Sequence, residues 1–109
     1  MKPIDINPND LCQVQAILRK YVPEYDVWVF GSRVQWTAKK TSDLDLAVIT
    51  DVPLDTICLA DLKEALSQSD LPFKVDVVDW AVTGEAFRKI ITREYELIQI
   101  SKFRCVCPA

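Results

Sequence analysis

The chain has 109 residues, half of them hydrophobic, and its 13 Lys and Arg against 16 Asp and Glu give a net charge of −3. This length predicts a single domain over residues 1–109, with room for one core. The acidic balance argues against a general nucleic-acid binder, because such proteins normally present a basic surface.

No membrane or export segment is expected. No apolar run reaches the length that spans a bilayer, and the opening MKPIDINPND does not resemble a signal peptide. The sequence therefore predicts a cytoplasmic protein. Zinc binding is not expected either, because the chain has no histidine and its four cysteines lack the paired spacing of a zinc site. Two of these cysteines, Cys105 and Cys107, fall in a tail (101–109) without periodicity that we expect to be loosely ordered.

The first predicted elements are a helix and a strand. Asn7 and Pro8 are typical of a helix start, apolar residues then recur at helical spacing, and Pro23 closes a helix of about fourteen residues. A strand is predicted over 26–30.

A glycine turn follows that strand. Gly31 lets the backbone approach a ligand closely, and consecutive N–H groups at such a turn can bind an anion. Ser32 adds a hydroxyl donor and could cap a short helix, while Arg33 adds a permanent cation. We therefore predict that Gly31, Ser32 and Arg33 bind nucleotide phosphates. In the loop up to Ser42, we expect Trp36 to be a packing anchor rather than a platform for a base.

The second predicted strand, 43–50, carries two carboxylates. Asp43 and Asp45 share a face because alternate strand residues project the same way, and they are about 7 Å apart by strand rise. Two like charges at that distance repel by about 2–3 kcal/mol, and a divalent metal bound by both carboxylates turns this repulsion into attraction. The plain alternative is a strand with an acidic solvent face.

The second half of the chain repeats helix and strand. A helix introduced by Pro53 and Asp55 precedes a turn and a strand over 73–80. A last amphipathic helix starts after Thr83–Gly84, and 95–100 is either a strand or a helix end. Together, these helices and strands predict a small mixed sheet flanked by helices, an α/β (α+β) fold.

A third carboxylate is expected on strand 73–80. Asp76 lies mid-strand in an apolar run, where a buried unpaired carboxylate would be costly unless a metal compensates it. Asp79 is the competitor, but alternation turns it to the other face. The plain alternative for Asp76 is an ordinary exposed position on an edge strand. The prediction is thus a three-carboxylate metal site of Asp43, Asp45 and Asp76.

The pattern Gly31-Ser32, ten residues, Asp43-Leu44-Asp45 resembles the signature of polymerase-β-like nucleotidyltransferases. Residues 27–80 are similar to the minimal nucleotidyltransferases, the family that includes MntA-type antitoxins. One departure is that Val34, Gln35 and Trp36 stand where the family often has Ala-Arg-Gly.

The resemblance implies a function. Gly31 and Ser32 would hold the triphosphate, and Asp43, Asp45 and Asp76 would bind Mg²⁺. Such proteins pair with a HEPN-type protein and transfer AMP from ATP to its tyrosine, which silences a toxin. We expect no helical substrate domain after the last helix, and acceptor recognition is then expected to come from another polypeptide or from another copy of this chain. Two alternatives stay open: a small-molecule acceptor bound by a partner subunit, and a non-catalytic module that neutralises its partner by contact.

Overall fold

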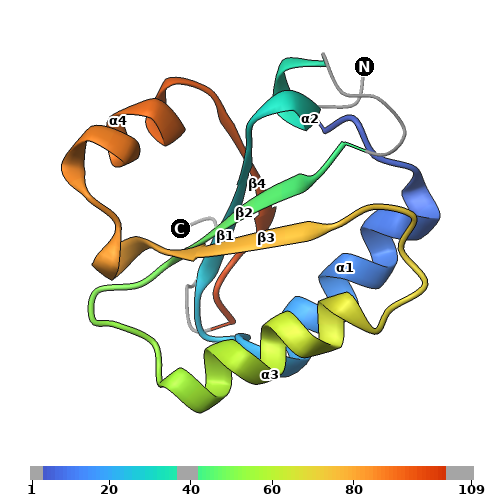
Figure 1. The fold of residues 1–109 in the computed structure, drawn as a ribbon, viewed down its shortest axis with the longest axis horizontal. Coiled ribbons are helices and arrows are strands. Elements are labelled where there is room, and N and C mark those ends of the chain that lie inside the picture. Colours follow the sequence, from blue (N-terminus) through green and yellow to red (C-terminus); the bar gives the residue numbers. More distant parts are fainter. Residues whose placement is uncertain (1–3, 37–41, 103–109) are drawn as a thin grey trace, which may run out of the picture.

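A mixed four-stranded sheet organises the chain (Figure 1). The computed structural model describes residues 4–36 and 42–102. The strands are β1 (Asp26–Phe30), β2 (Leu44–Ile49), β3 (Val75–Asp79) and β4 (Tyr95–Gln99), in the spatial order β3-β2-β1-β4. β1 is antiparallel to β2 and β4, whereas β2 and β3 are parallel. The predicted mixed sheet flanked by helices is confirmed.

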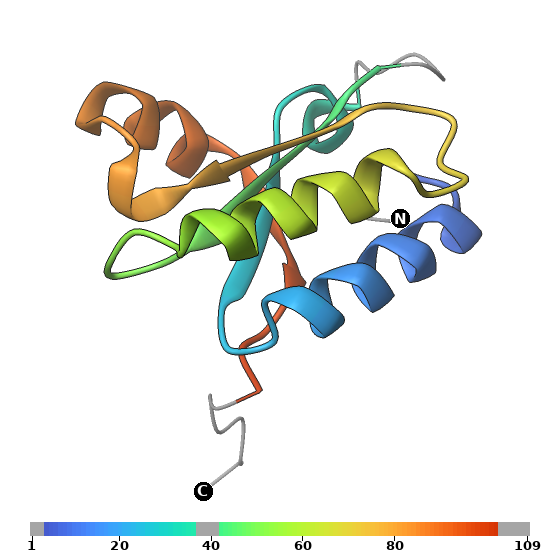
Figure 2. The same ribbon diagram turned by 60° about the horizontal axis from the view of Figure 1, so that its bottom comes forward.

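Two helices cover one face of this sheet, α1 (Pro8–Tyr21) and α3 (Thr56–Ser67), which lie side by side in Figure 2. The predicted caps are present, since the side chains of Asn7 and Asp55 accept hydrogen bonds from the N–H groups of Asn9 (2.9 Å) and Ile57 (3.1 Å). Apolar side chains from both helices and from alternate strand positions form the main core. Its fully buried members include Val14, Leu18, Val27, Val29, Leu44, Leu46, Val48 and Leu62.

The opposite face is covered only in part, by α4 (Glu85–Arg93) (Figure 1). Ile91 of α4 packs with Phe30 and Ala47, while Trp28 stacks on Tyr95 with a centroid distance of 4.0 Å. A short helix, α2 (Ser32–Gln35), follows the C-terminal end of β1, and the part of this face between α2 and α4 carries no helix in Figure 1. Asp45 and Asp76 belong to this face of the sheet.

The element boundaries differ from the predicted ones mainly at the ends of strands. β3 stops at Asp79 because its carboxylate caps a 3-10 turn, η1 (Trp80–Val82), accepting from the N–H of Ala81 (3.3 Å). The ambiguous segment 95–100 is a strand, β4. Ser101, predicted to be in a loose tail, donates its N–H to Asp26 (2.7 Å), whereas Cys105 and Cys107 lie outside the described residues.

Over the described ranges, no helix combines the length and the apolar character that crossing a membrane requires.

Candidate active site

The glycine turn and the second strand meet at one point. Gly31 follows β1 directly, and the register pairs Phe30 with Asp45. Gly31 has φ +84°, and a Cβ built on it would lie 2.5 Å from Oδ2 of Asp45. Only a residue without a side chain therefore fits between the turn and this carboxylate. The predicted proximity of the Gly-Ser turn to the acids is confirmed for this pair.

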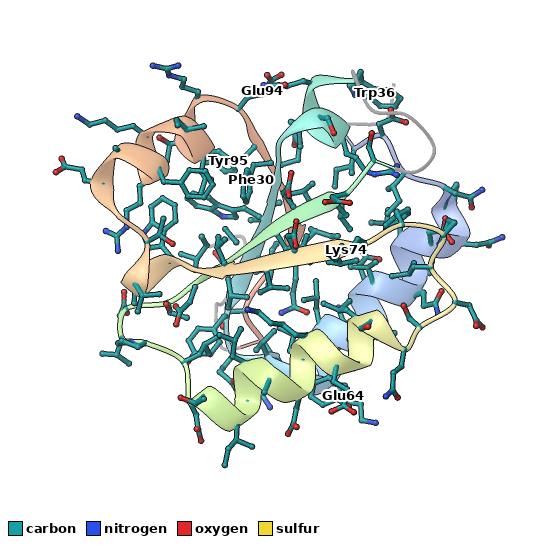
Figure 3. All side chains as sticks on the ribbon, in the orientation of Figure 1. Phe30, Trp36, Glu64, Lys74, Glu94 and Tyr95 are labelled. Atoms are coloured by element: carbon teal, nitrogen blue, oxygen red, sulfur yellow. The ribbon has the colours of Figure 1, made fainter. Side chains whose placement is uncertain are left out.

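Gly31 is also the N-cap of a short helix, α2 (Ser32–Gln35). A helical turn was predicted here with Ser32 as its cap, so the cap is one residue earlier than expected. Trp36 ends α2 in a left-handed conformation (φ 59°) and is 48% exposed, pointing away from the sheet (Figure 3). This exposure contradicts the prediction that Trp36 is a packing anchor.

Asp76 lies beside Asp45 in the parallel register of β2 and β3. Val75 and Val77 turn towards the main core, so Asp76 projects to the opposite face, the one that Asp45 shares with Ala47. Asp43 precedes β2 by one residue and is exposed. Asp45 and Asp76 therefore share one face, as predicted, whereas Asp76 is exposed on the edge strand and not in the apolar mid-strand setting that was expected.

Burial and two neighbouring carboxylates act on Asp45. The pKa of Asp45 is raised to about 6 from 3.8, first by burial, then by the charge of Asp76 and then by that of Asp43. Asp45 is only half-buried, so solvent screens part of this repulsion. A carboxylate held among like charges is a natural ligand for a cation.

The pH dependence of stability follows from that shift. Because the folded-state pKa of Asp45 is raised, the folded protein binds this proton more tightly than the unfolded chain, and stability falls as pH rises from about 4 through about 6. We expect the metal-free protein to be about 1–2 kcal/mol more stable at low pH than at neutral pH from this group, after discounting for screening. Urea unfolding at a series of pH values measures it. Asp45→Asn should remove this component, and equal pH slopes for variant and parent would contradict the assignment.

The described carboxylates do not by themselves form a complete metal site. Among residues 4–36 and 42–102, no three Asp, Glu, Cys or His side chains are already gathered tightly enough to enclose a metal ion. Mg²⁺, however, is usually held by one or two carboxylates together with substrate phosphates. The residues fit a cation shared between Asp45, its neighbours and a polyphosphate at the Gly31 turn.

Asp79, the rejected candidate, has a structural role. It is 5% exposed and accepts hydrogen bonds from the Thr50 hydroxyl and from the N–H of Leu54 (2.7 Å). Its carboxylate therefore ties β3 to the segment after β2, on the face away from Asp76.

Arg33 is placed differently from the prediction. It is 5% exposed, its guanidinium donates to the carbonyl oxygens of Asp5 (2.8 Å) and Ser42 (2.9 Å), and it lies 4.2 Å over the ring of Phe73. Through its hydrogen bond to Ser42, this side chain stabilises the backbone just before Asp43. These contacts do not favour the predicted role of Arg33 in binding phosphate.

Arg33→Met should therefore destabilise the fold by about 2–3 kcal/mol, because it removes charged hydrogen bonds to partly buried carbonyl groups. The exposed Arg93 of α4 offers the matched control, Arg93→Met, which should stay within about 0.5 kcal/mol of the parent. Urea unfolding separates the two. An Arg33→Met protein as stable as its control would show that these hydrogen bonds contribute nothing.

Two lysines near Asp76 were not among the predicted site residues. Lys74 is two positions before Asp76, so strand alternation could have indicated it. Lys63 comes from α3, and no sequence spacing links it to the site. Both line a groove beside Asp76.

Comparison with known proteins gives a consistent result. The family model for polymerase beta nucleotidyltransferases matches residues 13–103. The probable protein adenylyltransferase MntA of Haemophilus influenzae is 54% identical over 96 residues, which cover 88% of this chain and 84% of that protein.

Solved structures share the fold. A crystal structure of a toxin–antitoxin with AMP-PNP has a TM-score of 0.71 and 26% identity, covering 85% of this chain and 75% of that one. A complex of the tri-AMPylated Shewanella oneidensis HEPN toxin with its MNT antitoxin has a TM-score of 0.63 over 83% of this chain and 69% of that one. At 23% identity, this second likeness establishes only the fold.

Proposed function

This chain belongs to the polymerase beta nucleotidyltransferase family, in its MntA-type branch, and from that premise we propose that it transfers AMP from ATP to a tyrosine hydroxyl of a HEPN-type partner, as the antitoxin of a toxin–antitoxin pair. The observation that carries the proposal is the convergence of Gly31, Asp45 and Asp76 at one end of the open sheet face. The likeness to an MntA protein and to a toxin–antitoxin crystallised with AMP-PNP supports the choice of ATP and of a protein acceptor.

Each residue has a chemical task in this scheme. The backbone N–H groups at Gly31 and Ser32 bind the triphosphate, because consecutive amides at such a turn attract anions. Asp43, Asp45 and Asp76 hold Mg²⁺, which stabilises the attacking and leaving oxygens when it is bound. Burial first, and then the charges of Asp76 and Asp43, raise the pKa of Asp45, and a bound cation would offset the part that comes from repulsion.

Asp76, the more exposed of the two strand carboxylates, faces the acceptor. The acceptor oxygen attacks the α-phosphorus of ATP and forms the new O–P bond. The bond from that phosphorus to the bridging oxygen breaks, and pyrophosphate leaves. Asp76 takes up the hydroxyl proton or orients the hydroxyl in line with the leaving oxygen.

A transfer assay tests the proposal. The purified chain, a HEPN-type protein encoded beside it, labelled ATP and Mg²⁺ should give label on the partner. An Asp43→Asn/Asp45→Asn double variant should give none, and a chelator should stop the reaction. No label with the parent chain, or equal labelling by the double variant, would refute the proposal.

A further inference from the structure

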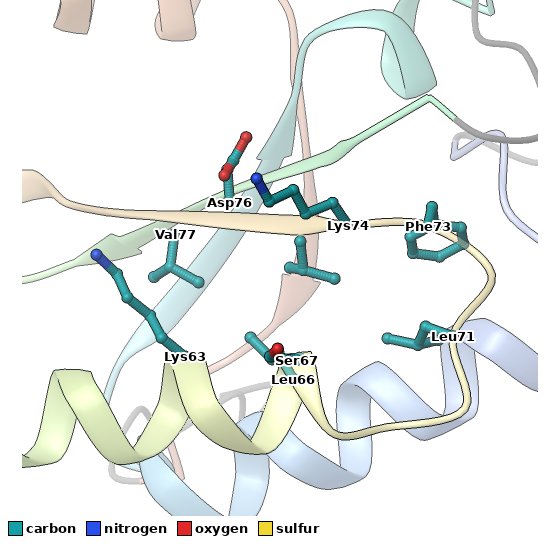
Figure 4. A pocket seen from close by; sticks show the side chains of 9 residues that line it. Lys63, Leu66, Ser67, Leu71, Phe73, Lys74, Asp76 and Val77 are labelled. Carbon is teal, nitrogen blue, oxygen red and sulfur yellow. The ribbon is translucent and has the colours of Figure 1, made fainter.

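A groove lies along the outer edge of β3, between that strand and the second half of α3 (Figure 4). Its volume is about 340 Å³. Leu66, Leu71 and Phe73 give it apolar walls, and Asp76 lies at its edge. The groove therefore opens directly beside one of the three candidate metal ligands.

Two lysines give this groove a positive rim, although the whole chain carries a net charge of −3. Lys63 extends from α3 and Lys74 from the segment leading into β3, and both point towards the strand in Figure 4. Both side chains are exposed, and neither forms an ion pair with another described residue. The ammonium groups are thus available to a negatively charged ligand.

The strand that borders the groove is an edge strand. Among the described strands, β3 pairs only with β2, so the backbone groups on its outer side have no strand partner. An extended peptide can add to such an edge through main-chain hydrogen bonds, while pockets beside the strand select its side chains. The apolar walls next to this edge suit an aromatic side chain.

The position of the groove relative to the candidate site indicates which ligand it would bind. Gly31 follows β1, Asp45 is in β2 and Asp76 is in β3, so the groove adjoins Asp76 on the side opposite the phosphate-binding turn. We propose that this groove binds an extended, acidic segment of the acceptor protein, next to the hydroxyl that receives the nucleotide. The inference rests on the proposed function, in which Asp76 faces that hydroxyl.

Peptide binding tests the inference without relying on transfer. Two short tyrosine peptides, one flanked by Glu and one flanked by Lys, are titrated into the isotope-labelled full chain at low ionic strength, and backbone amide signals are followed by NMR. The acidic peptide should shift signals of β3 and of the last turns of α3, and the basic peptide should not. Binding of the acidic peptide should weaken about tenfold in Lys63→Glu/Lys74→Glu.

The matched control is Lys89→Glu/Arg93→Glu, which makes the same change in net charge on the exposed surface of α4 and should bind the acidic peptide like the parent. Equal responses to both peptides, or unchanged binding by Lys63→Glu/Lys74→Glu, would overturn the inference. A titration with metal-free ATP gives a further test. If ATP shifted the same amide signals, and its affinity depended on these two lysines, the groove would bind the nucleotide and the inference would be overturned. Failure of the proposed function would show itself separately, as absence of label in the transfer assay.

Discussion

Asp45→Asn is expected to abolish nucleotidyl transfer while making the metal-free protein more stable. The substitution removes the carboxylate that lies between the glycine turn and Asp76, and with it the ligand best placed to share a cation with the nucleotide. We expect a loss of about 10³-fold in the transfer rate, which corresponds to several kcal/mol of lost transition-state stabilisation. Labelled-ATP transfer at saturating nucleotide measures it.

The stability of the Asp45→Asn variant should increase although its transfer activity is lost. Asparagine keeps the shape of the side chain but removes a charge that burial, Asp76 and Asp43 all disfavour. At neutral pH the variant should gain about 1–2 kcal/mol in the free energy of unfolding, a figure reduced because Asp45 is partly exposed. The exposed Asp61 of α3 provides the control, Asp61→Asn, which should change neither quantity. A fully active Asp45→Asn protein would show that Asp45 is not part of the active site.

Gly31→Ala should have the second largest effect. The new Cβ would fall 2.5 Å from Oδ2 of Asp45, and φ +84° is unfavourable for any residue with a side chain. Either the turn or the carboxylate must shift. We expect a cost of about 1–3 kcal/mol in stability and a loss of about 10²-fold in transfer rate, as is typical of a displaced reacting group.

The chain supplies its own control for that substitution. Gly84, the N-cap of α4, has φ −64°, and a Cβ added there would meet no atom within 4 Å beyond its chain neighbours. Gly84→Ala should remain active and lie within about 1 kcal/mol of the parent in stability. Urea unfolding and the transfer assay are run on both variants. If Gly31→Ala and Gly84→Ala behaved alike, the close approach of Gly31 to Asp45 would have no functional consequence.

Local signals were sufficient to predict most of the fold. Asn7 with Pro8, and Asp55, mark the starts of α1 and α3 through hydrogen bonds that depend only on nearby residues. Alternation along β3 correctly separated Asp76 from Asp79, because the main core lies on one face of the sheet only. Alternation along β2 likewise predicted the face of Asp45, which Asp76 shares.

Features that depend on tertiary packing were not predictable in this way. Arg33 follows a glycine turn, where a solvent-facing cation is a reasonable expectation, yet its partners Asp5, Ser42 and Phe73 come from three separate segments. The position of Lys63 beside β3 depends on how α3 docks on the sheet, which no residue spacing encodes. The roles of Gly31, Ser32, Asp43, Asp45 and Asp76 remain predictions that the geometry supports.

The central claim is that Asp43, Asp45 and Asp76 form one site that a cation completes together with a nucleotide. The most direct test is an NMR titration of the Asp45 side-chain carboxyl group, first in metal-free protein and then with Mg²⁺ and a non-hydrolysable ATP analogue. We predict a pKa of about 6 without metal and a clear fall in that pKa when Mg²⁺ and the analogue are added. An ordinary carboxyl pKa in the metal-free protein, unchanged by Mg²⁺ and the analogue, would contradict the claim.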